Sequence, residues 1–461
     1  NRTHMQDTPN ALIIIGITGD LSTRKLLPSL IRLEKNGLLD DDLHIVGTSR
    51  RNVDVDSIFE DIKDSDDLSN ASLTKLKKRI TIVQADVGEK AGTDILKVML
   101  DDLLPKICRT KLFYFAIPPS ALQGIIKNLV RSEVHTCGGD IASRLLIEKP
   151  FGRDLHSATE LSSVITDYFG SESIYSIDHY LAKETVQNVL YLRFHNPILH
   201  HIWSTHHIKS IQIDALESLD IQGRGDFYEQ TGALRDMLQS HLMQLLATVT
   251  MDEPKTMQPD DIRPNRLALL KQVSLSTEVQ PLRAQYEGYK AEVNNSESAV
   301  ETYASIELAI NTNRWQGVPI TLTAGKAMKN KKTEIKIVFE SHTDHKEENT
   351  FVFQIQPNEG LSLGIAVKKS GLQDGTKTIN LEYCYDTEQD QFSDGYDRIL
   401  HDALVGDQTL FPSTDEILNN WKLFQPVLDT WQDGSDDLIE YPKGSEKIVK
   451  KGAQSWNIKY I

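Results

Sequence analysis

The sequence predicts an N-terminal α/β domain with a doubly wound parallel sheet, followed by an α+β domain with a large, mostly antiparallel sheet flanked by helices. Up to about Ile177, short apolar runs alternate with amphipathic stretches, which is typical of a parallel sheet covered on both faces. Beyond it, segments of strand periodicity follow one another without intervening helices, which indicates antiparallel strands. The 461 residues accommodate two such domains, which we place at residues 5–178 and 179–461.

The first domain is expected to contain six strands and four helices. The strands are the short apolar runs Ala11–Ile15, His44–Thr48, Ile80–Ala85, Lys111–Ala116, Arg144–Ile147 and Ile174–Ile177. The helices are the stretches of helical spacing Arg24–Lys35, Ala91–Leu104, Ala121–Val130 and Leu155–Phe169.

The second domain is expected to begin with helices, continue as strands and end with helices. The predicted helices are Glu184–Phe194, Glu229–Met251, Asp397–Val405 and Thr414–Trp431. The predicted strands are Ile208–Ala215, Tyr303–Ile310, Pro319–Thr323, Thr333–Phe339, Phe351–Ile355, Ser362–Val367 and Thr378–Tyr383. The polar stretch Tyr286–Ser298 is expected to form an exposed loop.

The composition excludes several classes of protein. A formal charge of −16 argues against nonspecific nucleic-acid binding and requires a locally basic pocket for any anionic substrate. No run approaches the roughly 18–20 apolar residues of a membrane span, and the N-terminus lacks the pattern of a signal peptide. The cysteines Cys108, Cys137 and Cys384 fit no metal spacing. We therefore expect a cytoplasmic protein with reduced thiols and neither a bound metal nor a membrane or nucleic-acid partner.

A glycine-bearing turn joins the first predicted strand to the first helix. The turn reads Gly16-Ile-Thr18-Gly19-Asp20-Leu21. Such a turn lets the backbone approach a pyrophosphate, which the N-terminus of the following helix attracts. The spacing departs from G-x-G-x-x-G, so an ordinary strand-to-helix turn is the alternative interpretation.

The end of the second predicted strand bears on the choice of cofactor. It reads Thr48-Ser-Arg50-Arg51, without the acidic residue that would bind the ribose 2′-hydroxyl of NAD. Arg50 could instead pair with the 2′-phosphate of NADP, although two arginines at a strand end could simply be solvated. In a Rossmann-like domain this pattern favours NADP, with NAD as the second choice.

Three further segments carry a family resemblance. They are Ile147-Glu-Lys149-Pro150-Phe-Gly152, Ile177-Asp178-His179-Tyr180-Leu-Ala-Lys183-Glu184 and Gly232-Ala-Leu-Arg-Asp236-Met-Leu-Gln-Ser-His241. Together with the turn after Ile15, these segments resemble the glucose-6-phosphate dehydrogenase family in order and spacing. The likeness continues through Arg224-Gly-x-x-Tyr228, Trp315-Gln-Gly-Val-Pro319, Gly325-Lys326, Gln356-Pro-Asn-Glu359 and Trp421, and so covers nearly the whole chain.

The resemblance implies oxidation of glucose 6-phosphate to 6-phosphoglucono-1,5-lactone with hydride transfer to NADP, the entry to the oxidative pentose phosphate pathway. By the family pattern, His241 is the general base and Asp178 orients it. The chemistry agrees, because removing the hydroxyl proton needs a base with a pKa near neutrality. A lone histidine on an apolar helix would otherwise be interpreted as a buried residue bonded to a carbonyl.

The resemblance also implies how substrate and cofactor are held. His179, Tyr180 and Lys183 match the positions that hold the sugar phosphate, and their donors suit a dianion. Glu217 and Asp236 match the acceptors of sugar hydroxyls. Lys149 and Lys326 match lysines at the substrate site. The implied cofactor-binding residues are Gly16, Thr18, Gly19, Asp20, Leu21, Lys25, Arg50 and Lys149.

Four positions depart from the family pattern: Ser176 replaces Arg, Ala182 replaces Gly, Ser240 replaces Asn and Thr323 replaces Arg. The loss of an arginine at position 176 predicts weaker phosphate binding. These changes leave two alternatives open, a member that oxidises another aldose or aldose phosphate, and a catalytically silent homologue with a binding or regulatory role. The resemblance further implies a homodimer or homotetramer, assembled through the large sheet.

Overall fold

The computed structural model describes residues 9–60, 62, 70–104, 110–136, 143–341, 347–371, 375–385, 395–432 and 437–448. The chain forms two compact units. Unit 1 comprises Asn1–Lys183, Pro254–Leu267 and Asp386–Leu418, and unit 2 comprises Glu184–Glu253, Ala268–Tyr385 and Asn419–Ile461. Cys384 is an exposed free thiol, while Cys108 and Cys137 lie outside the described residues.

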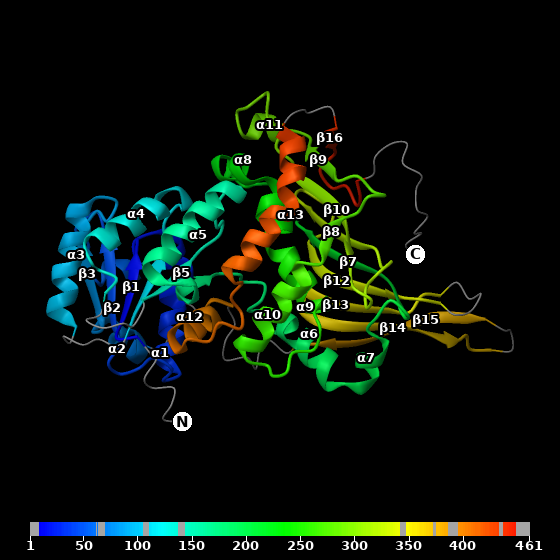
Figure 1. Ribbon diagram of the computed structural model, residues 1–461, viewed down its shortest axis with the longest axis horizontal. Coiled ribbons are helices and arrows are strands. Elements are labelled where there is room, and N and C mark those ends of the chain that lie inside the picture. The colour runs from blue at the N-terminus through cyan, green and yellow to red at the C-terminus, as the bar shows by residue number, and fades with distance from the viewer. Residues whose placement is uncertain are drawn as a thin grey trace. The chain divides into compact units, whose positions relative to one another are not determined.

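Unit 1 is built on a six-stranded sheet in the order β3-β2-β1-β4-β5-β6, and every pair of neighbours is parallel (Figure 1). Because the strand order reverses between β1 and β4, the carboxyl ends of these two strands mark the switch point of a doubly wound sheet. The strands are β1 (Ala11–Ile15), β2 (His44–Ser49), β3 (Ile80–Gln84), β4 (Lys111–Phe115), β5 (Arg144–Ile147) and β6 (Ile174–Ser176).

Helices flank the parallel sheet, as the alternating pattern predicts. Helix α4 packs with α3 and with α5, and α1 packs with α2 (Figure 1). Helix α2 and the 3₁₀ turns were not predicted, because these segments are too short to show a period. The elements are η2 (Ser22–Leu26), α1 (Leu27–Lys35), η3 (Ser57–Phe59), α2 (Asn70–Lys77), α3 (Lys90–Leu103), α4 (Pro119–Arg131), α5 (Leu155–Phe169) and η4 (Ser171–Ser173).

Two later segments complete unit 1, although the predicted boundary placed both in the second domain. They contain most of α10 (Pro259–Leu270), the whole of α12 (Gly395–Val405) and the start of α13 (Thr414–Gln432). Arg32 of α1 donates two hydrogen bonds, of 2.7 and 2.8 Å, to the buried carboxylate of Asp397 in α12. Contacts between side chains far apart in sequence thus attach α12, which explains why local periodicity did not reveal its partner.

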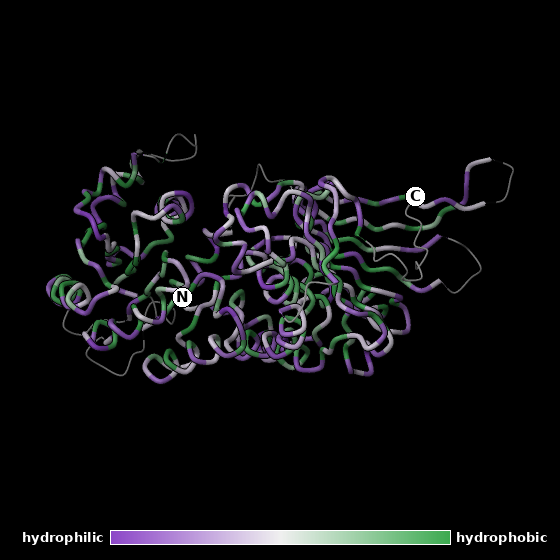
Figure 2. The backbone as a smooth tube through the Cα atoms, turned by 90° about the horizontal axis from the view of Figure 1, so that it is seen from above, coloured by the Kyte–Doolittle hydropathy of each residue, from purple (hydrophilic) through white to green (hydrophobic). Residues whose placement is uncertain are grey.

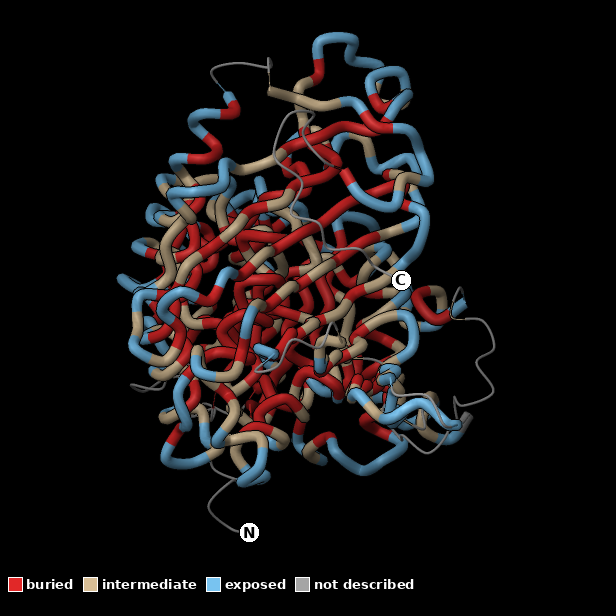
Figure 3. The backbone as a smooth tube through the Cα atoms, turned by 90° about the vertical axis from the view of Figure 1, so that its right-hand side faces the viewer, coloured by how far each residue is buried: buried red, intermediate tan, exposed pale blue. Residues whose placement is uncertain are grey.

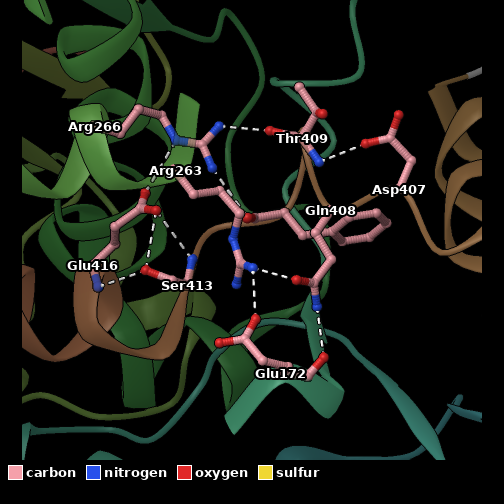
Figure 4. A network of polar contacts seen from close by, with 9 residues as sticks. Glu172, Arg263, Arg266, Asp407, Gln408, Thr409, Ser413 and Glu416 are labelled. Carbon is pink, nitrogen blue, oxygen red and sulfur yellow. Dashed lines mark hydrogen bonds and ion pairs between the residues drawn. The ribbon is translucent and has the colours of Figure 1, made fainter. Parts of the chain in front are cut away.

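A second network attaches α10 within the same unit (Figure 4). Arg266 forms a buried ion pair of 3.3 Å with Glu416 and donates to the carbonyl of Thr409 at 2.8 Å. Arg263 contacts Gln408 and Glu172, so that it joins α10 to the turn that precedes β6. Arg266 thus supplies donors to the backbone carbonyls of Thr409 and Phe411, which helps to compensate for their burial.

Unit 2 is built on a ten-stranded sheet in the order β15-β14-β13-β12-β7-β11-β10-β9-β16, with β8 pairing to β10. The pairs β7–β11 and β9–β16 are parallel and the other neighbours are antiparallel, so the predicted mostly antiparallel sheet is confirmed. The strands are β7 (Ile208–Leu216), β8 (Val273–Leu275), β9 (Leu282–Tyr286), β10 (Tyr303–Ile310), β11 (Ile320–Gly325), β12 (Lys332–Phe339), β13 (Thr350–Gln356), β14 (Gly360–Lys368), β15 (Thr376–Cys384) and β16 (Ile439–Tyr441).

The helices of unit 2 differ from the prediction at one important place. The predicted helix Glu229–Met251 is helical along most of its length, but it is interrupted at Gly232, whose φ is 65° and ψ 177°. A π-helix begins two residues later. The elements in this unit are α6 (Glu184–His195), α7 (Pro197–Ile202), α8 (Gly225–Ala233), η5 (Leu234–Leu242), α9 (Met243–Thr250) and α11 (Tyr289–Glu292).

The predicted exposed loop Tyr286–Ser298 is also wrong in part. Tyr286 and Tyr289 are almost fully buried and belong to a cluster of tyrosines that pack edge to face. The predicted loop was inferred from its polar residues, but these two rings anchor it to the core.

Hydropathy and burial follow the elements. Helices carry both hydrophobic and hydrophilic stretches in Figure 2, as expected when one face of a helix is covered. In Figure 3 the buried segments lie inside and the exposed segments surround them. No helix in the described part of the chain is long and apolar enough to cross a membrane.

Candidate active site

The predicted dinucleotide turn lies at the switch point of the parallel sheet. Gly16 follows β1 directly and has a φ of +88°, and a Cβ atom there would lie 2.6 Å from the carbonyl oxygen of Ala116, which follows β4. Only glycine fits this conformation and this close approach. The turn is closed by a hydrogen bond of 3.0 Å from the Gly19 N–H to the Gly16 carbonyl. The fold therefore places a side-chain-free backbone where doubly wound sheets bind dinucleotides.

The helix after this turn begins with π-helical winding, in η2. Ser22, its first residue, is buried and donates from its hydroxyl to the Gly16 carbonyl at 3.1 Å. Lys25 lies in η2 with its Nζ 6.0 Å from the centre of the Tyr396 ring. Thr18 and Asp20 are exposed, and Leu21 is half-buried. These residues thus belong to the glycine turn or to the start of the helix that follows it.

Arg50 follows β2 and is exposed. Within the described part of the chain its side chain makes no hydrogen bond or ion pair, unlike Arg24, which pairs with Asp20 at 2.6 Å. A guanidinium at the carboxyl edge of the sheet is suited to bind an incoming phosphate.

Lys149 and Asp178 come together at the ends of β5 and β6. The Lys149 ammonium donates to Asp178 Oδ2 at 2.9 Å, and the Tyr180 N–H donates to Asp178 Oδ1 at 3.0 Å. Asp178 is 1% exposed. The peptide bond between Lys149 and Pro150 is cis. The structure therefore fixes the orientation of a buried carboxylate that the resemblance assigns to catalysis.

Glu148, which sequence reasoning missed, lies directly before this lysine. It accepts hydrogen bonds from the phenols of Tyr114, in β4, and Tyr396, in α12, the latter at 3.1 Å. Burial raises the pKa of Glu148, and the phenols and Lys149 oppose that shift. In the sequence Glu148 is distinguished only by its place directly before Lys149. That position does not predict its contacts with the two phenols.

The segment after Asp178 forms a compact turn. The Leu181 N–H donates to the Asp178 carbonyl at 3.1 Å, and the Lys183 N–H donates to the Tyr180 carbonyl at 3.2 Å. The rings of His179 and Tyr180 have their centres 4.8 Å apart. Lys183 directly precedes α6. The turn thus gathers the three predicted phosphate donors of unit 1 along one short segment.

Two predicted substrate residues meet in unit 2. Parallel pairing of β7 and β11 sets Leu216 opposite Gly325, so the next residues, Glu217 and Lys326, leave the sheet together. Lys326 Nζ donates to Glu217 Oε2 at 2.6 Å. Lys326 is 5% exposed, and Glu217 is half-buried.

Asp236 and His241 both lie on the π-helix η5. A π-helix bonds residue i to residue i+5, so residues five apart lie on the same face, as residues four apart do in an α-helix. In an α-helix, with 3.6 residues per turn, residues five apart would point in different directions. The π winding therefore aligns these two side chains. Ser240 donates from its hydroxyl to the Asp236 carbonyl at 3.0 Å, and His241 is 4% exposed.

The structure thus groups the predicted residues within each unit. Unit 1 holds the glycine turn, Lys25, Arg50, Lys149 and the segment from Asp178 to Lys183, while unit 2 holds Glu217, Asp236, His241 and Lys326. Both π-helical segments of the described residues, η2 and η5, carry predicted site residues. Such segments occur frequently at functional sites.

A parallel sheet with a glycine turn at its switch point defines a dinucleotide-binding unit, as in nicotinamide-dependent oxidoreductases. Comparisons with known proteins specify the family. The sequence profile described as "Glucose-6-phosphate dehydrogenase, NAD binding domain" matches residues 13–188, and the profile described as "Glucose-6-phosphate dehydrogenase, C-terminal domain" matches residues 190–456.

Individual proteins agree with the profiles. The glucose-6-phosphate 1-dehydrogenase of Chlamydia pneumoniae is 36% identical, over 97% of this chain and 96% of its own length. That of Bacillus subtilis is 33% identical, over 98% and 99%. A solved glucose-6-phosphate dehydrogenase in complex with its substrate glucose-6-phosphate superposes with a TM-score of 0.88, at 30% identity and 96% of both chains. The chain therefore belongs to the glucose-6-phosphate dehydrogenase family.

Proposed function

We propose that the protein oxidises D-glucose 6-phosphate to 6-phosphoglucono-1,5-lactone and that NADP accepts the hydride. The main support is that both domains of the family match in sequence, while the residues that the resemblance assigns to the site occupy ordered positions in both units. In this scheme residues 5–178 bind the dinucleotide, and residues 179–461 bind the substrate and form the oligomer.

The residues of unit 1 suit the binding of NADP. The backbone of Gly16 and Gly19 faces the pyrophosphate with Thr18, Asp20 and Leu21 around it, and Lys25 lies on the helix that follows. Arg50 binds the 2′-phosphate, which favours NADP over NAD. When bound, NADP supplies a nicotinamide ring that accepts a hydride. Lys149 serves both cofactor and substrate.

The remaining residues bind the sugar and move its proton. His179, Tyr180 and Lys183 donate hydrogen bonds to the phosphate, while Glu217 and Asp236 accept them from the sugar hydroxyls, with Lys326 holding Glu217. His241 takes the proton of the 1-hydroxyl as the hydride leaves C1. Asp178 stabilises the imidazolium that results, as in other base–orienter pairs.

Three further features belong to the proposal. A cytoplasmic location is supported by the relative from Arabidopsis thaliana named glucose-6-phosphate 1-dehydrogenase 5, cytoplasmic, which is 33% identical over 98% of this chain. A homodimer or homotetramer is supported by the outer strand β15, on which Leu381 and Tyr383 are 52% and 57% exposed. NAD is the second-choice cofactor.

The test is to mix the purified protein with glucose 6-phosphate and to follow the absorbance of the reduced cofactor, with NADP and NAD in parallel. We expect rapid reduction of NADP and slower reduction of NAD. His241→Asn, which removes the base but keeps a polar side chain, is expected to lower kcat by about 10⁴-fold. Intact activity in this variant would show that the base is misassigned.

Galactose 6-phosphate and free glucose, measured with the same preparation, define the substrate. Glucose 6-phosphate should have the highest kcat/KM, because the epimer misplaces a hydroxyl and free glucose lacks the phosphate. A higher kcat/KM for either alternative would support a member that acts on another aldose. No reduction with any sugar would support a catalytically silent homologue.

A further inference from the structure

The start of η5 is held by a buried glutamate that has no place in the mechanism above. Glu301 lies shortly before β10 and is 5% exposed. Its carboxylate oxygen Oε1 accepts the Leu234 N–H at 2.9 Å, and its backbone carbonyl accepts the Ala233 N–H at 3.0 Å. One residue therefore satisfies two consecutive N–H groups at the beginning of the helix that carries Asp236 and His241.

Gly232 has the conformation that this attachment requires. Its φ of +65° lies in the left-handed region, and a Cβ atom there would lie 2.4 Å from Glu301 Oε1. The absence of a side chain lets the carboxylate reach the N–H groups beyond it. Gly232 and Glu301 thus form one joint, which ends α8 and begins the π winding.

The same short segment also reaches the other substrate residues of unit 2. The carbonyl of Thr302, next to Glu301, accepts the Lys326 N–H at 2.9 Å. Lys326 in turn donates to Glu217 at 2.6 Å. Residues 301–302 therefore connect the start of η5 to the pair formed by Glu217 and Lys326.

We infer that Glu301 is a positioning residue, which fixes the start of η5 so that Asp236 and His241 face the sugar from one side of the helix. This inference rests on the proposed roles of those two residues. The reason is geometric. A helix that begins one residue earlier or later rotates all its side chains by about 100°, and in a π-helix the alignment of residues five apart depends on where the winding begins.

Two conservative variants separate the reach of the side chain from its charge. Glu301→Gln keeps an acceptor oxygen at the same length but removes the charge. Glu301→Asp keeps the charge but draws it back by one methylene group from the Leu234 N–H. If the contact positions η5, the Gln variant should retain kcat/KM within about fivefold, whereas the Asp variant should lose about 30- to 100-fold.

Glu229→Gln is the matched control. Glu229 lies on α8 one turn before Gly232 and accepts hydrogen bonds from Tyr289, Ser298 and Asn295 at 2.8, 2.6 and 2.9 Å, all of them outside η5. The Glu229→Gln substitution is expected to lower the unfolding temperature but to change kcat by less than about twofold. All variants are compared at a temperature where circular dichroism shows them folded.

The decisive readout is the pattern of Michaelis constants. Displacement of η5 should lower kcat and raise the KM for glucose 6-phosphate, while the KM for NADP, which binds unit 1, stays unchanged. A partly unfolded sample would lower kcat and leave both KM values unchanged. If Glu301→Asp matches Glu301→Gln or Glu229→Gln in kcat and in the sugar KM, the inference is overturned. This outcome is distinct from failure of the proposed function, in which the wild type is inactive or His241→Asn remains active.

Discussion

Unit 1 and unit 2 each hold part of the predicted site, but they hold it in different ways. In unit 1 all of the residues except Lys25 lie on segments that follow parallel strands, where the sheet itself brings them to one edge. In unit 2, Asp236 and His241 lie on the π-helix η5, whose winding the sequence pattern does not predict. Glu301, which is far away in the sequence, accepts a hydrogen bond from the start of that helix. The first arrangement follows from topology and the second from particular side-chain contacts.

A glutamate supports each arrangement. In unit 1 Glu148 accepts hydrogen bonds from two phenol hydroxyl groups. It directly precedes Lys149, which donates a hydrogen bond to Asp178. In unit 2 Glu301 accepts the backbone N–H of Leu234. Burial raises the pKa of both carboxyl groups. Four changes probe the two arrangements separately, three of them in unit 1 and one in unit 2.

Among these four changes, the largest effect is expected at Asp178, in unit 1. Asp178→Asn keeps an acceptor for the Tyr180 N–H but loses the charge that faces Lys149. We expect kcat to fall by about 10³-fold, because the neutral amide no longer stabilises an imidazolium. Steady-state kinetics measures this loss. An Asp178→Asn enzyme with wild-type kcat would remove Asp178 from the mechanism.

The next effect concerns the joint of unit 2. Gly232→Ala should lower the free energy of unfolding by about 2–4 kcal/mol, because the new Cβ meets Glu301 in a strained conformation. Gly223→Ala is the control, since Gly223 has a φ of +75° and a Cβ atom added there would meet no other atom within 4 Å. It should cost only about 1 kcal/mol. Equal losses in urea unfolding would mean that the contact with Glu301 contributes nothing.

A smaller effect is expected for cofactor choice in unit 1. Arg50→Ala should raise the KM for NADP by roughly tenfold and leave the KM for NAD unchanged, because only NADP carries the 2′-phosphate. Arg51→Ala, at the neighbouring exposed position, serves as the control. A parallel rise of both KM values would show that Arg50 contacts something other than the 2′-phosphate.

The smallest effect is a pH dependence of stability. Because the folded-state pKa of Glu148 lies above its ordinary value of 4.5, the folded protein binds more protons than the unfolded chain above that pH. Wild-type stability should therefore fall relative to Glu148→Gln as the pH rises from 4.5, by at most about 1.4 kcal/mol per pH unit. Unfolding of both proteins at several pH values measures the difference. Parallel curves would contradict the raised pKa.

The sequence predicted the parts of the molecule that are specified locally. Ala11–Ile15 and Leu155–Phe169 have the predicted bounds, because a buried strand shows a continuous apolar run and a helix shows its period. The glycine turn was predicted from Gly16 and Gly19, and the structure adds the close approach to Ala116 that explains it. The remaining site residues are predictions that rest on the family motifs.

Long-range contacts account for what the sequence did not reveal. The break at Gly232 depends on Glu301, 69 positions further along the chain, and the assignment of α12 to unit 1 depends on the pair of Arg32 and Asp397. In neither pair does the sequence around one residue indicate which distant residue it contacts. The π winding of η5 likewise has no hydrophobic period of its own that distinguishes it from an α-helix.

In the proposed mechanism Asp178 and His241 act together on one proton. A double-mutant cycle with Asp178→Asn, His241→Asn and the combined variant tests this claim. If the two residues act as a unit, the double variant should have about the same kcat as the slower single variant. If the two losses instead multiply, each residue acts independently, and the claim is contradicted.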